Sequence, residues 1–72
     1  MSPPIQEVKA KHERRFLAMP EVVSVGIGLD PEGNPAIIIG LARHHPKTLE
    51  QLPKLVDGYP VKVEVIGPVR AL

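Results

Sequence analysis

Large apolar residues alternate with very small ones along positions 21–29 of the chain. Valine, isoleucine and leucine occupy every second position, and this period of two in β-favouring residues predicts a strand near residues 22–29. The other parity holds Ser24, Gly26 and Gly28, which have almost no side chain. One face of the strand is therefore heavy and the other nearly bare, and we expect this strand to be the central one of the fold.

The residues before this strand repeat at helical spacing. Ser2 suits an N-cap, and the two prolines after it suit a first helical turn, where a missing N–H costs little. Pro20 disfavours helical geometry at the residue before it, so the helix should end near residue 18. These signals predict an amphipathic helix over about residues 3–18. Its apolar stripe, at spacings of three and four, consists of Ile5, Val8, His12, Phe16 and Met19.

Two further strands are predicted. Residues 36–42 alternate in the same way and follow the turn sequence Asp30–Pro35, so they should pair antiparallel with the first strand. In residues 60–66, valines again occupy every second position. Lys62 and Glu64 lie on the other parity, which is typical of an edge strand with one solvent-exposed face. The neighbour and direction of this third strand stay open, because a crossover beside the second strand and an antiparallel position beside the first both fit.

The connection from Arg43 to Tyr59 contains one clear helix signal. Thr48-Leu49-Glu50-Gln51 is a capping-box pattern and predicts a short helical turn that opens there. Pro53 limits this turn unless the proline starts a second turn over residues 53–56. Asp57-Gly58 then predicts a turn before the third strand.

Together these elements predict the order α-β-β-α-β. The expected fold class is α+β, a two-layer sandwich with a three-stranded sheet and the helices on one face. Residues 1–72 are expected to form a single small domain. The side chains expected to point inward are Val23, Val25, Ile27, Ile37, Ile39, Leu41, Val61, Val63 and Val65 from the strands, and Ile5, Val8, Phe16, Leu52 and Leu55 from the other layer.

Size and composition narrow the class of protein. A chain of 72 residues buries only roughly 60–65% of its unfolded surface, so its stability margin should be thin. There is no cysteine, hence no disulfide, thiol nucleophile or thiolate metal site, and a formal charge of +1 does not indicate a polyanionic partner. No apolar run approaches a membrane span and the N-terminus lacks a secretory pattern, so we expect a soluble, cytoplasmic protein without a membrane partner.

The sequence contains no constellation typical of an active site. Gly26-Ile27-Gly28 lies inside a strand rather than between a strand and a helix, and so lacks the mechanics of a phosphate-binding loop. His44 and His45 are adjacent and, with His12, make an incomplete metal shell, which favours surface histidines. Neither serine lies in a Gly-x-Ser-x-Gly sequence. We therefore expect no enzyme activity, no catalytic residues, no cofactor and no metal site.

Basic residues on the first helix and in the Arg43–Lys47 loop could come together in a patch that binds nucleic acid. Glu7 and Glu13 interrupt the helix charges, and one Tyr and one Phe are too few for base-stacking platforms. A solvated surface is therefore the favoured interpretation, and nucleic acid is not the expected partner. The residues of the patch would be Lys9, Lys11, Arg14, Arg15, Arg43, His44, His45 and Lys47.

The order of the sequence blocks resembles that of a small bacterial module. The blocks are Met19–Gly28, Pro35–Ile39, Leu52-Pro53 and Asp57–Val63, and the resemblance covers about Phe16 to Ile66. The module precedes the catalytic part of some trypsin-like peptidases and also occurs as a short separate protein. The resemblance implies an accessory or interaction module that carries no catalytic residues and has no assigned biochemical role.

These observations predict a non-catalytic interaction or assembly module. The alternatives are a nucleic-acid-binding module that uses the first helix and the Arg43–Lys47 loop, and an accessory subunit that binds a small ligand. The helices can cover only one side of the sheet, so we expect a homodimer, or binding of another protein, through the bare face or an open strand edge. The predicted interaction face consists of Ser24, Gly26, Gly28, Ile38, Gly40, Lys62, Glu64 and Ile66.

Overall fold

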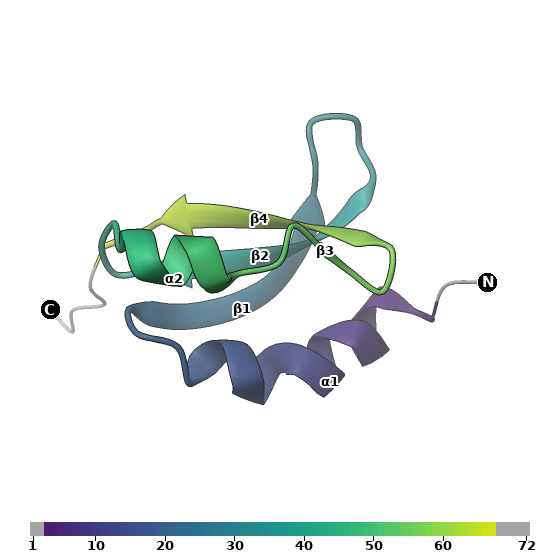
Figure 1. Cartoon of the computed structure of the whole chain (residues 1–72). Coiled ribbons are helices and arrows are strands. Elements are labelled where there is room, and N and C mark those ends of the chain that lie inside the picture. Colours follow the sequence, from purple (N-terminus) through teal and green to yellow (C-terminus); the bar gives the residue numbers. More distant parts are fainter. Residues whose placement is uncertain (1–2, 68–72) are drawn as a thin grey trace, which may run out of the picture.

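The computed structural model describes residues 3–67, which form a four-stranded sheet with two helices (Figure 1). In chain order the elements are α1 (Ile5–Leu17), β1 (Val22–Leu29), β2 (Pro35–Leu41), α2 (Pro46–Gln51), β3 (Leu55–Val56) and β4 (Tyr59–Val65). The α+β class is confirmed, whereas the expected sheet of three strands is wrong because β3 adds a fourth. The N-cap predicted at Ser2 lies outside the described residues.

The strands are ordered β1-β2-β4-β3 across the sheet. β1 is antiparallel to β2, β4 is parallel to β2, and β3 is antiparallel to β4. The expectation that β1 is central is therefore wrong: a short hairpin joins it to β2, and β4 occupies the other side of β2. The crossover between parallel strands also resolves the open position of the third predicted strand, which lies beside the second.

β3 and β4 form a tight hairpin that the periodicity did not predict. Asp57 and Gly58 have positive φ values of 49° and 89°, as a type I′ turn requires, and Val56 pairs with Tyr59 across the turn. Leu55 was expected to point inward but is 64% exposed, because it alternates with the buried Val56 in a strand. The Asp-Gly dipeptide between apolar residues was the signal for this hairpin.

α2 begins three residues earlier than the capping-box pattern indicated. Its N-cap is His45, whose ring Nδ1 accepts a hydrogen bond from the Thr48 N–H at 3.2 Å, and Pro46 is in the first turn. Thr48, the N-cap that the pattern predicted, lies inside the helix and is 1% exposed. Its hydroxyl donates to the carbonyl oxygen of Pro20 at 2.9 Å. A buried hydroxyl needs such a partner, so Thr48 fastens α2 to the turn between α1 and β1.

A bulge near the start of β1 changes which of its residues face the core. The pairing register with β2 shifts between Val22 and Ser24. As a result Val22 is buried at 8% exposure, whereas Val23, which was expected to point inward, is 39% exposed. An extra residue in one strand shifts the parity before it, and apolar periodicity alone does not reveal that extra residue.

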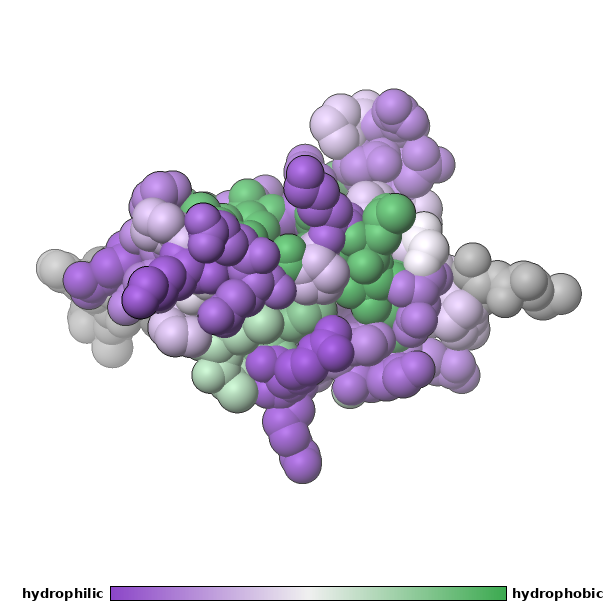
Figure 2. Space-filling model, viewed as in Figure 1, coloured by the Kyte–Doolittle hydropathy of each residue, from purple (hydrophilic) through white to green (hydrophobic). Residues whose placement is uncertain are grey.

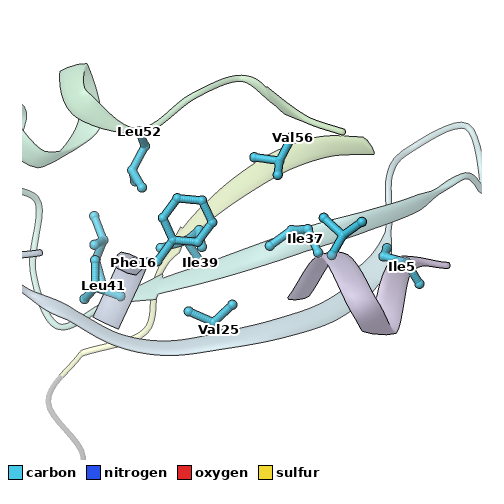
Figure 3. Packing of buried hydrophobic residues seen from close by; sticks show 10 residues of the cluster. Ile5, Phe16, Val25, Ile37, Ile39, Leu41, Leu52 and Val56 are labelled. Atoms are coloured by element: carbon cyan, nitrogen blue, oxygen red, sulfur yellow. The ribbon is translucent and has the colours of Figure 1, made fainter. Parts of the chain in front are cut away.

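The core lies between the helices and one face of the sheet (Figure 3). Phe16, at 1% exposure, packs among aliphatic side chains from β2 and the crossover, including Ile39 and Leu52. Fully burying one such side chain stabilises the fold by about 1.5–3 kcal/mol. Most of the predicted core is confirmed, but Val65, which was expected to point inward, is 56% exposed. The buried apolar cluster consists of Ile5, Val8, Phe16, Val22, Val25, Ile37, Ile39, Leu41, Leu52 and Val56.

Two glycines on the uncovered face should respond differently to substitution by valine. A Cβ on Gly40 would overlap Ser24 Oγ and lie 2.9 Å from Ile66 Cδ1, whereas a Cβ on Gly26 would have no neighbour within 4 Å. We expect Gly40→Val to lower the free energy of unfolding by about 1–3 kcal/mol and Gly26→Val to leave it nearly unchanged. Urea unfolding of both variants tests this, and equal midpoints would contradict it.

Candidate interaction surface

The predicted interaction face lies opposite the helices. Both helices pack on the other face of the sheet, where the core is. Cross-strand pairing brings most of the predicted residues together, since residues that pair directly share a face. Ile66 joins them by its side chain, which reaches over Gly40. The rows across the sheet are Ser24, Gly40 and Glu64; Gly26, Ile38 and Lys62; and Gly28 with Ala36.

This face is more self-covered than the sequence suggested. The side chain of Ile38 lies over Gly28, since a Cβ there would be 2.9 Å from Ile38 Cγ1. Ile66 lies over Gly40 in the same way, although it remains 51% exposed. The absence of a side chain at these two glycines therefore leaves room for the neighbouring isoleucine side chains. The face that remains is partly polar, because Lys62 and Glu64 lie on it.

A free strand edge adjoins this face along β1. Asp30 N–H donates to the carbonyl oxygen of Asn34 at 2.8 Å, which makes these residues a hydrogen-bonded pair at the end of the hairpin. Hydrogen-bonded and non-hydrogen-bonded pairs alternate along an antiparallel ladder. Ser24, Gly26 and Gly28 therefore direct their main-chain groups toward β2. The outward groups belong to Val25, Ile27 and Leu29, which pair with Ile39, Ile37 and Pro35 without ladder bonds.

Large apolar side chains are also exposed along this edge. Ile27 is 43% and Leu29 64% exposed, although Ile27 was expected to lie in the core. The start of α1 lies close to β3 and β4 rather than over the end of β1, as Figure 1 shows. There, His12 Nε2 lies 3.3 Å from Asp57 Oδ2, and the Tyr59 hydroxyl donates to the carbonyl oxygen of Pro3. The end of β1 is consequently left without a helix over it.

The three histidines have different surroundings. His45 caps α2, and His12 stacks on Phe16 with ring centroids 6.0 Å apart while facing Asp57. His44 is exposed in the loop before α2. Within residues 3–67, no group of three or more His, Cys, Asp or Glu side chains is placed to hold a metal ion. The capping and stacking contacts are local, since His45 lies three residues before Thr48 and His12 four residues before Phe16. Only the contact of His12 with Asp57 joins distant parts of the chain.

Several members of the predicted basic patch have local partners. Lys9 Nζ lies 3.0 Å from Glu13, and Arg43 Nε lies 3.2 Å from Glu21. The guanidinium of Arg15 lies 5.2 Å from the centroid of the Phe16 ring. Exposed ion pairs such as these contribute little to stability, about 0–1 kcal/mol each, but they reduce the positive potential available to a polyanion.

Shallow grooves border the helices. One of about 170 Å³ is lined by Pro3, Glu7, Val8, Lys11 and Asp57 and, like two larger grooves, it includes no residue of the predicted interaction face. Figure 2 shows apolar side chains at the surface between two mostly hydrophilic helices. The groove there has a volume of about 340 Å³ and is lined by Arg15, Phe16, Met19, Gln51 and Pro53. A third groove of about 500 Å³ lies along α1 and is lined by Ala10, Glu13, Arg14, Leu17 and Ala18.

Among the helices of residues 3–67, none combines the length and apolarity that a membrane crossing requires. Comparison of the chain with protein-family models, curated proteins and solved structures found no match. The resemblance to the module that precedes some trypsin-like peptidases therefore stays a prediction.

Removal of metal ions should not change the stability of the protein. His12 lies on α1, whereas the adjacent His44 and His45 precede α2, and a closed shell of ligands is not assembled in the described part of the chain. A bound structural metal contributes its binding free energy to folding, so its removal would lower the thermal melting midpoint. Since we expect no such metal, the midpoint should be the same with and without EDTA. A drop of several degrees on adding EDTA would refute this.

Proposed function

We propose that this chain is a non-catalytic interaction module that acts by self-association, as a homodimer. The observation that carries the proposal is the one-sided packing of the sheet. Both helices pack on one face, so among residues 3–67 no helix lies over the other face and no strand pairs with the outer edge of β1. Such surfaces on small domains are typical protein-interaction sites.

The size of the domain supports this proposal. A domain of 72 residues buries a smaller share of its surface than a larger one, so a few further buried side chains matter for its stability. Exposed apolar side chains on β1 and Ile66 at the end of β4 are available for such burial. A homodimer is the commonest closed arrangement that covers a patch of this kind.

The charges on the uncovered face are compatible with a second copy. Lys62 and Glu64 are two residues apart on β4 and share that face. In a contact related by a two-fold axis, a contact of one residue with a second residue of the partner is matched by the reciprocal contact, so a Lys62–Glu64 pairing between copies would form twice. A contact made through the uncovered face would have these two residues at its polar rim. The pairing of Lys9 and Arg43 with carboxylates gives the nucleic-acid alternative less support.

The mass of the protein in solution tests the proposal. Light scattering at about 100 μM should give the mass of a dimer that dissociates on dilution, a concentration that reveals even an affinity of tens of micromolar. Ile38→Lys, compared with Gln51→Lys as a variant of equal charge on exposed α2, shows whether the uncovered face takes part. A strictly monomeric mass at this concentration, unchanged by either substitution, would remove the proposal.

A further inference from the structure

We infer that β1 forms the dimer contact, by pairing antiparallel with β1 of a second copy. This inference rests on the proposed self-association and adds the surface and the register. The pairing would join the two sheets edge to edge into one sheet. The two-fold axis of an antiparallel strand pair stands perpendicular to the sheet, so the helices of both copies would lie on the same side.

The β1 edge lacks the features that usually prevent such pairing. Soluble proteins protect exposed edges with very short strands, charges, prolines or bulges. β1 has eight residues, none of them charged or proline, and its bulge lies at the start, between Val22 and Ser24. The opposite side of the sheet is protected, because β3 has only two residues and β4 carries Lys62 and Glu64. This asymmetry favours a closed dimer over an open-ended chain of sheets.

The outward main-chain groups determine the register. In a pair related by a two-fold axis, the outward groups of Val25, Ile27 and Leu29 are all used when Ile27 lies on the axis. Ile27 then pairs with the partner's Ile27, and Val25 pairs with the partner's Leu29. Each of these pairs exchanges two N–H···O bonds, so no outward donor or acceptor of the three residues is left unpaired.

The exposed side chains agree with this register. Val25, Ile27 and Leu29 point to the helix side of the sheet, and Ile27 and Leu29 are 43% and 64% exposed there. Pairing would place each Leu29 beside the partner's Val25, and the two Ile27 side chains beside each other. The contact therefore buries the apolar side chains that α1 leaves uncovered. Apolar side chains opposite each other across strands stabilise such a pair.

Charge also favours a second copy as the occupant. The paired segments carry no charge, so two copies meet without repulsion along the ladder. In this register the partner's acidic turn, with Asp30 and Glu32, lies near the start of β1. Arg43 is held at that end by Glu21, at 3.2 Å, and its side chain is 75% exposed. Its guanidinium has further donors that remain free to meet the partner's carboxylates.

The variant Ile27→Pro tests the main-chain contact. Proline removes an N–H that points away from β2, so the substitution leaves the β1–β2 ladder bonds in place. We expect the dimer dissociation constant to rise at least about tenfold, since both symmetric bonds at the axis are lost. Ile27→Thr keeps the N–H and the β-branched shape and should change the constant much less. Equal effects of the two variants, with melting midpoints like that of the parent, would overturn the inference.

Hydrogen exchange on the unaltered protein provides a second test. It needs no substitution, so its result does not depend on whether a variant folds. The amides of Val25, Ile27 and Leu29 should exchange more slowly as protein concentration rises, because pairing protects them. The amides of Gly26 and Gly28 bond to β2 and should be protected at every concentration. If the protein is a dimer and the three outward amides exchange at a rate independent of concentration, the edge contact is wrong while self-association stands. If Ile38→Lys dissociates the dimer and Ile27→Pro does not, the contact lies on the uncovered face and not on the β1 edge.

Discussion

Parallel pairing between β2 and β4 is the constraint on which the rest of the arrangement depends. Parallel neighbours require a connection that crosses over one face of the sheet, and here that connection contains α2 and β3. Leu52 from the crossover packs into the same core as Phe16 from α1, so both helices cover that face. Because β4 takes the other side of β2 and β3 pairs with β4, no strand of residues 3–67 pairs with the outer side of β1. The uncovered face and the free edge are therefore two results of one strand placement.

Local sequence patterns predicted most of the elements, because period two and period 3.6 depend on which residues face the core. The helix predicted over 3–18 is observed at Ile5–Leu17, and the strand predicted over 36–42 is observed at Pro35–Leu41. Features that depend on another part of the chain were not predicted. The bulge at Val22 exists only relative to β2, and the buried position of Thr48 depends on the Pro20 carbonyl.

The candidate surface shows the same division. Residue parity was sufficient to place Ser24, Gly40 and Glu64 in one row of the sheet, because side chains alternate between faces in every strand. Parity says nothing about how far a side chain lies across its neighbours, so the covering of Gly28 by Ile38 was not visible. The identity of the free edge also depended on the position of β4, which the sequence left open between two arrangements.

The connection between β2 and β4 also affects how the chain folds. The β1–β2 hairpin has a short turn, and hairpins of this kind form in about 1–10 μs. Until β4 arrives, the second side of β2 is unpaired, and β4 of any copy can occupy it. The crossover from Leu41 to Tyr59 keeps the chain's own β4 at an effective concentration on the order of millimolar. At micromolar protein concentration, β2 therefore pairs with β4 of its own chain rather than with β4 of another copy. The connection in this way disfavours exchange of the last strand between copies.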